Sequence, residues 1–325
     1  MSLHEGIGKK LIRGLKTGAP VFDILFSPLT LVAGIWFRVV RFWSFRNLPV
    51  TKSILLKLGV FPIVDHYYEP LFDFRKAGVR KISSKLDFND ARQLELLSQL
   101  TFDVELQNTP SNKTNKTEFY FNNGSFEDKD ARLYYSLIRK NKPARIIEIG
   151  SGFSTLMAVK AVAKNKDEVR SCEITCIEPY EMSYLEKLDV KLIRKKVEDI
   201  DVAVFAALEA NDILFIDSSH IIRPGGDVTH LLLSIVPILK SGVWIHIHDI
   251  FLPEDYPAHW LRDEFRMWNE QYLLEALLTG NPDFEIVCAL NYLFVTHKPQ
   301  LMQAFPGNLS GGNERRPGSF WIRKR

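Results

Sequence analysis

The sequence predicts a doubly wound α/β fold, in which helices cover both faces of a mostly parallel sheet. From about residue 126 onwards, short apolar runs alternate with stretches that have helical spacing. The run at 213–216 is apolar at every position, as in strands that are buried on both faces. Glycines or acidic residues follow several of these runs. Strands separated by helices imply right-handed β-α-β units, which build a parallel sheet.

The elements can be placed in order along this region. Between 127 and 140, for example, Leu133, Leu137 and Ile138 fall on one helical face. We expect helices at 127–140, 155–164, 180–188, 202–208, 228–239 and 260–278. We expect strands at 145–149, 174–177, 191–193, 213–216, 243–247, 284–289 and 320–322. Residues 86–106 also have helical spacing, ahead of the α/β region.

The composition is that of a globular protein with a sizeable core. Of the 325 residues, 46% are hydrophobic and 25% are charged, and the net charge of +3 argues against a strongly basic nucleic-acid binder. Three cysteines (Cys172, Cys176 and Cys288) are too few for a disulfide framework, and the close pair lacks the further ligands of a zinc site. Nothing resembles a signal peptide, so we expect a cytoplasmic protein.

The first 60 residues differ from the rest in charge. They carry nine Lys or Arg residues against Glu5 and Asp23, which gives +7 there and −4 for the remaining 265 residues. The uncharged stretch at 24–37 has 14 residues, fewer than the ~20 that span a bilayer, and Pro28 and Gly34 interrupt it. Basic flanks around an apolar core favour peripheral contact of residues 9–57 with an anionic membrane surface. Packing against the main domain or a dimer partner is an equal alternative.

These features divide the chain into three parts. Residues 1–60 form a basic, apolar and mainly helical segment, residues 61–125 a connector or cap region, and residues 126–325 the α/β domain. A homo-oligomer is compatible with this organisation, and the sequence leaves the oligomeric state open.

A glycine-containing loop follows the first predicted strand. It reads Glu-Ile-Gly-Ser-Gly-Phe-Ser-Thr at 148–155 and leads into a helix. Glycines let a backbone approach a ligand closely, and the start of a helix offers free N–H groups. A dinucleotide fingerprint would have a third glycine where this chain has Thr155, which weakens a pyrophosphate role. A tight structural turn is the alternative to a ligand-binding loop.

Acidic residues follow the second and third predicted strands. Glu178 is placed where a carboxylate usually accepts hydrogen bonds from ribose hydroxyls, because ligands bind beyond the carboxyl ends of such strands. Asp199 follows the third strand and could accept from an adenine amino group, and Glu198 is an equal candidate on sequence alone.

Polar residues also gather after the fourth and fifth strands. Asp217 follows one of these strands, and the pair His248 and Asp249 follows the other, so we expect the three side chains to converge. Two carboxylates and an imidazole suit a divalent cation such as Mg²⁺ or Mn²⁺. His220, three residues past Asp217, could accept a proton near neutral pH. His246 lies deeper in its strand and reads as a core histidine.

Together these motifs resemble class I S-adenosylmethionine-dependent methyltransferases. The residues that carry the resemblance are the loop at 148–155, the strand end at Glu178, Phe-Ile-Asp-Ser-Ser-His at 215–220 and His-Ile-His-Asp-Ile-Phe-Leu-Pro at 246–253. More narrowly, residues 126–325 resemble the methyltransferase domain 24 group, which is related to macrocin-type sugar O-methyltransferases. Residues 268–274 and 318–322 fit the same resemblance.

The resemblance implies a fold and a role for each matching residue. The fold is a seven-stranded Rossmann-like sheet whose last strand is antiparallel, and the cofactor is S-adenosylmethionine. The implied cofactor contacts are Glu148 near the amino group, Gly150, Gly152 and Ser154 in the loop along the methionine part, Glu178 at the ribose, Asp199 at the adenine, and Asp217 beside them. Asp217, His248 and Asp249 match metal ligands, and His220 matches the proposed base. His248 departs from the family pattern, which usually has two oxygen donors there.

The function implied is O-methylation of a hydroxyl on a small molecule or glycan, with a carbohydrate or glycoconjugate as the expected acceptor. One rival is a metal-dependent oxygenase, whose ligand triad is not matched because His248 and Asp249 are adjacent and should point to opposite sides of a regular strand. A non-catalytic binding module is the second rival, and the intact acidic and histidine set argues against it. An NAD-dependent dehydrogenase is the third, and Thr155 argues against that.

Overall fold

The computed structural model describes residues 19–65, 68–73, 85–168, 170–180, 182–306 and 315–325. The chain divides into two compact units, Met1–Asp73 and Phe74–Arg325. Four basic residues of the predicted membrane-contacting segment lie outside the described residues: Lys9, Lys10, Arg13 and Lys16.

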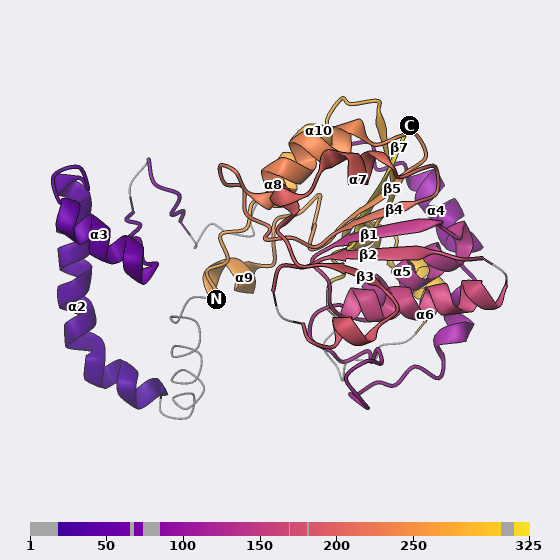
Figure 1. The fold of residues 1–325 in the computed structure, drawn as a ribbon, viewed down its shortest axis with the longest axis horizontal. Helices are drawn as coiled ribbons and strands as arrows, with labels where there is room; N and C mark the ends of the chain where they lie inside the picture. The colour runs from indigo at the N-terminus through magenta and orange to yellow at the C-terminus, as the bar shows by residue number, and fades with distance from the viewer. Residues whose placement is uncertain (1–18, 66–67, 74–84, 169, 181, 307–314) are drawn as a thin grey trace. The chain divides into compact units, whose positions relative to one another are not determined.

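The larger unit is built on a seven-stranded sheet with the order β3-β2-β1-β4-β5-β7-β6 (Figure 1). The neighbours among the first five strands run parallel, whereas β7 is antiparallel to both β5 and β6. The strands are β1 (Arg145–Ile149), β2 (Glu173–Ile177), β3 (Lys191–Ile193), β4 (Ile213–Ile216), β5 (Trp244–Ile247), β6 (Phe284–Ala289) and β7 (Phe320–Lys324). The predicted Rossmann-like, doubly wound fold with an antiparallel last strand is confirmed.

Helices cover both faces of this sheet, as Figure 1 shows. One layer contains α4 (Asp90–Gln99), α5 (Asp128–Asn141) and α6 (Phe153–Asp167), and the other contains α7 (Val202–Ala206), α8 (Asp227–His230) and α10 (Glu270–Leu278). The central strand β4 shows why its sequence is apolar throughout. Side chains alternate across a strand, so Ile213 and Phe215 enter one core cluster while Leu214 and Ile216 enter the other.

Shorter elements complete the larger unit. These are α9 (Ala258–Arg262), α11 (Leu290–Thr296), α12 (Lys298–Ala304), the 3₁₀ turns Phe102–Leu106, Leu185–Lys187, Val197–Asp199 and Val236–Ile238, and the π-helical turn Leu231–Ile235. The helix predicted at 180–188 was too long, because among the described residues of this stretch one 3₁₀ turn forms. The stretch predicted at 228–239 is helical from Asp227 to Ile238, but it changes from α to π to 3₁₀ geometry as it reaches Pro237, whose nitrogen cannot donate.

The predicted long helix at 260–278 is wrong in its middle. The structure ends α9 at Arg262 and begins α10 at Glu270. Between them Phe265 has a positive φ of 53°, and the Arg266 guanidinium stacks on Trp260 and Trp268 at 4.3 and 4.5 Å from the ring centroids. Backbone N–H groups just before α10 donate to the loop that follows β4, so tertiary hydrogen bonds replace helical ones there.

The described residues of the smaller unit form two helices, α2 (Ala19–Trp43) and α3 (Pro49–Leu58). We expected Pro28 to interrupt the first, and that expectation is wrong. Pro28 cannot donate to the carbonyl of Ile24, but the Ser27 hydroxyl donates to that carbonyl at 2.9 Å. By length and composition alone α2 could cross a membrane, and it is the one helix among the described residues of which this is true.

One contact fixes how closely β1 and β4 approach at their carboxyl ends. The Asp217 N–H donates to the Ile149 carbonyl at 2.9 Å, which brings the Asp217 backbone against Gly150. Gly150 has φ of +74°, and a Cβ atom there would lie 1.9 Å from the Asp217 carbonyl oxygen. Only glycine meets both conditions, so this glycine is required by the sheet itself.

Replacing Gly150 with alanine should therefore destabilise the protein strongly. We expect the free energy of unfolding to fall by about 3 kcal/mol or more, because overpacking adds to the strain of a positive φ. Gly280→Ala is the matched control, since Gly280 has φ of +69° with nothing within 4 Å of the added Cβ. The control should lose only about 1 kcal/mol. Urea denaturation measures both, and equal losses would contradict the close-contact explanation.

Candidate functional site

Three predicted metal ligands meet at the carboxyl ends of β4 and β5. One donor atom from each of Asp217, His248 and Asp249 lies within 4.8 Å of the other two. His248 Nδ1 lies 3.6 Å from Asp217 Oδ1 and 3.7 Å from Asp249 Oδ2. The predicted convergence of these side chains is observed.

The side chains of His248 and Asp249 face the same site, contrary to our expectation for adjacent residues of a regular strand. Strand β5 already ends at Ile247, and Asp249 adopts a left-handed backbone conformation with φ of +55°. The alternation of side chains stops where the strand ends. Gly318 packs against this turn, because a Cβ atom there would lie 3.0 Å from Asp249 Cα.

His220 joins the same cluster from the loop after β4. Its Nε2 lies 3.3 Å from Asp217 Oδ1 and 3.7 Å from Asp249 Oδ2, and its Nδ1 lies 2.9 Å from Glu270 Oε2. Burial lowers the pKa of His220, but hydrogen bonds to Asp217 and Glu270 outweigh burial and raise it well above its ordinary value. The two carboxylates therefore favour the protonated form of the imidazole.

The pKa values of Asp217 and His248 shift in the directions expected of a buried ion pair. Burial raises the pKa of Asp217, yet the charges of His248 and His220 hold it well below its usual range. Burial also lowers the pKa of His248, and the charges of Asp249 and Asp217 raise it to about 10. The charged forms of Asp217 and His248 therefore stabilise each other across the 3.6 Å between Oδ1 and Nδ1.

Glu270 is a site residue that the sequence did not reveal. It is fully buried at the first position of α10, fifty residues from the histidine it contacts. Because 260–278 reads as one continuous helix, Glu270 would lie in mid-helix with no reason to face the site. A glutamate next to Trp268 and Asn269 in the motif that fits the family was the one signal available. The Trp268 ring also contacts His220, at 4.2 Å between centroids.

The predicted ribose ligand Glu178 is tied to the glycine loop. Its two carboxylate oxygens accept hydrogen bonds from the Ser151 and Tyr180 backbone N–H groups, at 3.2 and 2.8 Å. A cavity of about 220 Å³ lies beside this carboxylate and reaches Gly150 and Asp217. Its remaining lining is Ile149, Ile177, Pro179, Tyr180, Lys196, Val197, Glu198, Ser218, Ser219, Arg223 and Asp227. Of the two adenine candidates, Glu198 lines the cavity and Asp199 does not.

Glu148 lies below the glycine loop and is completely buried. Its Oε2 accepts from the Thr155 hydroxyl, which in turn accepts from the Gly152 N–H at 3.0 Å. Thr155 therefore closes the loop where a dinucleotide fingerprint would have glycine. Glu148 Oε1 has no hydrogen-bond partner among the described residues. Burial raises the pKa of Glu148 to about 7, although the hydrogen bond from Thr155 lowers it.

The other two predicted loop residues take up different positions. Ser154 is buried in the first turn of α6. Gly152 is extended, and a Cβ atom there would lie 3.7 Å from the Tyr184 hydroxyl, an ordinary contact. The protein alone therefore does not require glycine at 152, in contrast to Gly150.

A larger cavity of about 700 Å³ lies on the other side of Asp217. It includes His248 and Asp249, the aromatic rings of Phe251 and Trp260, and several charged side chains. The remaining lining is Gly124, Ser125, Pro257, Ala258, His259, Glu264, Arg266, Arg315 and Arg316. Asp217 is thus the residue that lines both cavities.

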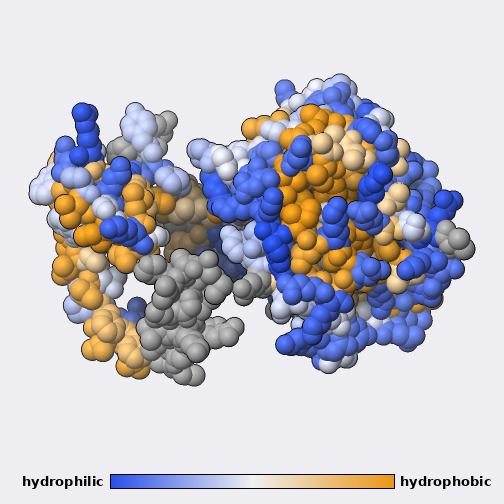
Figure 2. Space-filling view, viewed as in Figure 1, coloured by the Kyte–Doolittle hydropathy of each residue, from blue (hydrophilic) through white to orange (hydrophobic). Residues whose placement is uncertain are grey.

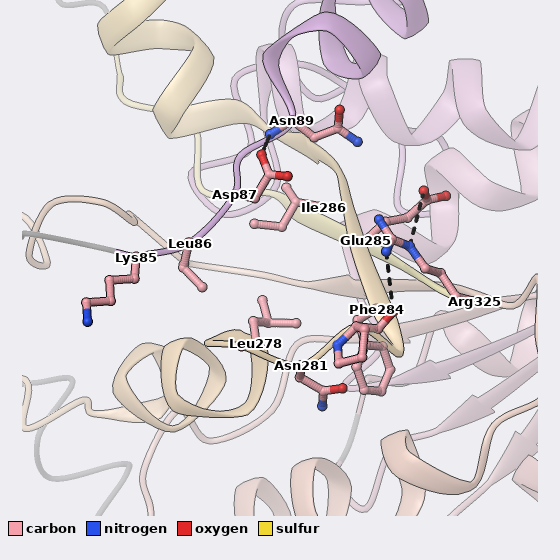
Figure 3. Close-up of a pocket in the computed structure, with 12 residues that line it drawn as sticks. Lys85, Leu86, Asp87, Asn89, Leu278, Asn281, Phe284, Glu285, Ile286 and Arg325 are labelled. Carbon is pink, nitrogen blue, oxygen red and sulfur yellow. Dashed lines mark hydrogen bonds and ion pairs between the residues drawn. The ribbon is translucent and has the colours of Figure 1, made fainter.

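A third cavity, of about 280 Å³, lies at the opposite end of the sheet (Figure 3). It is lined by Phe284 at the start of β6, by Leu278 at the end of α10 and by Arg325. Strand β6 points in the same direction as β5, because both are antiparallel to β7. The amino end of β6 therefore lies away from the carboxyl ends that carry Asp217 and His248. None of the predicted site residues lines this cavity.

His246 is buried in the core, as its position in the strand indicated. Its ring stacks on Phe215 at 4.0 Å between centroids, and its Nε2 lies 3.0 Å from the Ser319 hydroxyl. Burial lowers its pKa well below the ordinary value. Its neutral ring supports the sheet under the site.

Comparison with known proteins matches residues 147–250 to the model of a methyltransferase domain family. An uncharacterized protein of Archaeoglobus fulgidus is 34% identical over 180 residues, which cover 49% of this chain and 79% of that relative. The matched domain residues include the glycine loop, Glu178, Asp217, His220, His248 and Asp249.

Solved structures with similar folds include CmcI with SAH, CmcI with Mg and SAM, and an O-methyltransferase from Bacillus cereus with SAH. Their TM-scores are 0.35, 0.32 and 0.34, and their identities are 14%, 15% and 12%. The matches cover 61%, 62% and 72% of this chain and 78%, 72% and 90% of those chains. At these TM-scores the likeness carries no argument about individual residues.

The buried carboxyl group of Glu148 predicts a pH-dependent stability. Its pKa in the folded chain is about 7, whereas an unfolded glutamate titrates at about 4.3. The folded state then holds a proton that the unfolded chain releases, so the stabilisation is present below about pH 4.3 and is lost as the pH rises to about 7. Relative to Glu148→Gln, the wild type should lose about 3 kcal/mol of unfolding free energy across this range.

Urea denaturation at both ends of the range measures this difference. Glu186→Gln is a suitable control, because the side chain of Glu186 is exposed. The difference in unfolding free energy between the wild type and Glu148→Gln should change with pH. A constant difference would contradict the raised pKa of Glu148.

Proposed function

Because this chain belongs to the family of S-adenosylmethionine-dependent methyltransferases, we propose that it methylates a hydroxyl oxygen of a carbohydrate or glycoconjugate with the help of a divalent cation. One observation carries this proposal. Asp217 lines both the cavity beside the glycine loop and the larger cavity that contains His248 and Asp249. A methyl donor and an acceptor could therefore meet at one carboxylate.

The residues around the smaller cavity fit the methyl donor. S-adenosylmethionine, when bound, supplies an electrophilic methyl group on a sulfonium centre. Glu178 offers carboxylate oxygens beside the cavity for ribose hydroxyls, and Glu198 is placed for the adenine end. Glu148 Oε1 has no hydrogen-bond partner among the described residues and is our candidate for the amino group of the methionine part, but Glu148, like Asp199, lies outside the cavity lining. Asp199 is the weaker adenine candidate, because it lies outside the cavity lining.

The cluster of Asp217, His248 and Asp249 fits a divalent cation. Two carboxylates and one imidazole present donor atoms within 4.8 Å of one another, a mixed oxygen and nitrogen set that suits Mg²⁺ or Mn²⁺. A bound cation would supply positive charge that lowers the pKa of a neighbouring hydroxyl. It would also compensate the carboxylate charges that favour the protonated form of His220.

His220 is the residue we assign as the proton acceptor. Its Nε2 points at the metal-binding carboxylates, while Glu270 holds Nδ1 at 2.9 Å and so fixes the ring and its tautomer. The backbone carbonyl of His220 accepts from the N–H groups of Asn269 and Glu270, which holds the loop against α10. Glu270 is therefore a positioning residue for His220.

The lining of the larger cavity supports a polar, hydroxyl-rich acceptor. Trp260 and Phe251 offer ring faces or edges to the apolar side of a sugar, and His259, Glu264 and Arg315 offer hydrogen-bonding groups. The three arginines of this cavity each pair with a glutamate, namely Arg266 with Glu264, Arg315 with Glu127 and Arg316 with Glu254. Their charges are thus already compensated, which favours a neutral acceptor over a strongly anionic one.

Two variants should separate catalysis from cofactor binding. We expect His220→Ala to lower kcat by about 10²–10⁴-fold while the Kd for S-adenosylmethionine stays unchanged. Glu178→Ala should instead raise that Kd by roughly 10- to 100-fold, because a charge-assisted hydrogen bond is lost. Transfer of labelled methyl groups to a panel of sugar acceptors measures the first effect, and calorimetric titration measures the second.

Glu186→Ala is the control for general changes near Glu178, and it should affect neither quantity. No cofactor binding by the wild type would overturn the assignment of the donor site. Loss of cofactor binding in His220→Ala would overturn the base role.

Removing one carboxylate should weaken the cation site directly. We expect Asp249→Asn to lower the affinity for Mn²⁺ by at least ~10-fold, with a parallel loss of methyl transfer that added Mg²⁺ restores only in part. Electron paramagnetic resonance of free Mn²⁺ reports binding without any substrate. Asp255→Asn, in the same loop but outside the cluster, should bind Mn²⁺ as the wild type does. Full activity of the wild type in a chelator would contradict cation assistance.

A further inference from the structure

Helix α2 exposes an unusually large apolar surface (Figure 2). Val21, Ile24, Leu25, Leu29, Leu31, Val32, Ile35, Trp36, Phe42 and Trp43 are all exposed, and Ile24, Leu25 and Val32 are exposed by 77%, 64% and 63%. Of its 25 residues only Val40 is buried. A protein surface in water seldom keeps so many large apolar side chains together, so this surface indicates a partner that is itself apolar.

The polar residues of α2 lie on one stripe. Asp23, Ser27, Thr30, Gly34, Arg38 and Arg41 follow one another at intervals of four, three, four, four and three residues. At 3.6 residues per turn this spacing keeps them within about 80° of each other around the helix. The exposed apolar side chains occupy the remaining arc along the full length of the helix. An apolar arc with a polar stripe is typical of a helix that lies in the surface of a membrane.

The distribution of charge disfavours a helix that crosses the bilayer. The longest uncharged run of α2 is the 14 residues from Ile24 to Phe37, which at 1.5 Å per residue extend about 21 Å, whereas the hydrocarbon core is about 30 Å thick. Asp23 and Arg38 would both enter the core of a spanned bilayer. In a helix lying flat, both belong to the stripe that faces away from the lipid chains.

The charge of this region is complementary to an anionic surface. Residues 19–60 contain Arg38, Arg41, Arg46, Lys52 and Lys57 against the single acidic residue Asp23. Trp36 and Trp43 lie near the arginines at the end of α2, and tryptophan favours the boundary between headgroups and lipid chains. The following helix α3 adds Val50, Ile54 and Leu58, three exposed apolar residues spaced by four.

The end of α2 is held by contacts on its polar side. Arg41 forms an ion pair with Glu69, and its guanidinium also lies over the rings of Phe45 and Phe61 at 5.7 and 5.2 Å from their centroids. The Phe45 and Phe61 rings pack at 4.7 Å from each other. Among the described residues, contacts at this end cover Arg41 of the polar stripe and bury Val40 beside it, whereas the large apolar side chains from Val21 to Trp36 stay exposed.

From these observations we propose that α2 lies flat in the surface of an anionic lipid bilayer, with its apolar arc among the lipid chains and its polar stripe toward water. The remaining basic residues contact the acidic headgroups, namely Arg38 of α2, Arg46 of the turn and Lys52 and Lys57 of α3. Arg41 is instead paired with Glu69. This proposal is independent of the methyl-transfer reaction, because it concerns the smaller unit alone.

A pair of variants two residues apart tests the orientation. Val32 lies in the middle of the apolar arc, and Gly34 lies on the polar stripe about 200° around the helix. Nothing lies within 4 Å of a Cβ atom added at Gly34, so a larger side chain fits there. Val32→Glu and Gly34→Glu add the same charge at nearly the same position along the helix. Only the face of the helix differs.

Binding of the full-length protein to vesicles is the measurement, by flotation with phosphatidylcholine alone and with equal parts phosphatidylglycerol. We expect the wild type to bind the anionic vesicles preferentially and less well at high salt. Val32→Glu should lower the partition coefficient by at least ~10-fold, because it removes apolar burial and places a charge among the lipid chains. Gly34→Glu should lower it by less than ~3-fold, through weaker attraction to the headgroups.

Other results would overturn the proposal. Failure of the wild type to bind anionic vesicles would remove the membrane as partner. An equal fall of the partition coefficient in both variants would indicate a helix that crosses the bilayer, since both positions then lie at nearly the same depth. Unchanged binding in both variants would place the contact elsewhere in the chain. Circular dichroism and S-adenosylmethionine binding of each variant show whether it is folded, and they do not depend on vesicle binding.

Discussion

The site depends on how closely β1 and β4 approach each other at their carboxyl ends. The Asp217 carbonyl oxygen lies where any side chain at position 150 would have its Cβ atom, so the two strand ends can meet only across a glycine. This contact places the Asp217 side chain beside the glycine loop and also beside the end of β5. One carboxylate thereby borders the cavity beside the glycine loop, the larger cavity and the other two proposed cation ligands. The proposed roles in donor binding, cation binding and proton transfer all depend on this position of Asp217.

Around this point the protein buries ionisable groups that would be unfavourable alone. Burial disfavours the charged forms of Asp217, His220, His248 and Glu270, yet carboxylates and imidazoles alternate so that each charge has an opposite neighbour. Such a cluster is costly to keep without a function, since apolar residues of similar size would stabilise the fold at least as well. The buried carboxylate of Glu270, which belongs to α10, fixes the imidazole ring of His220 at the site. The geometry of the site therefore rests on α10 as much as on the strands.

The two units differ in where their apolar side chains lie. In the larger unit apolar side chains fill two cores on either side of the sheet, whereas in α2 they face outward. A hydroxyl replaces the missing proline hydrogen bond, which keeps the helix continuous through Pro28. Lipid chains are the environment that we propose for this surface. A membrane-bound chain would meet acceptors linked to lipid in two dimensions rather than three, which agrees with the glycoconjugate acceptor proposed for the larger cavity.

Apolar periodicity and polar strand ends are local patterns, so the doubly wound sheet, the order of its strands along the chain and the residues at the rim could be predicted from them. Asp217, His220, His248, Asp249, Gly150 and Glu178 could all be named from those patterns. Tertiary structure alone decided the break between α9 and α10, the turn that brings Asp249 to the same side as His248, and the contact of Glu270 with His220. These features depend on hydrogen bonds between segments far apart in the sequence, and spacing along a single chain carries no record of such contacts.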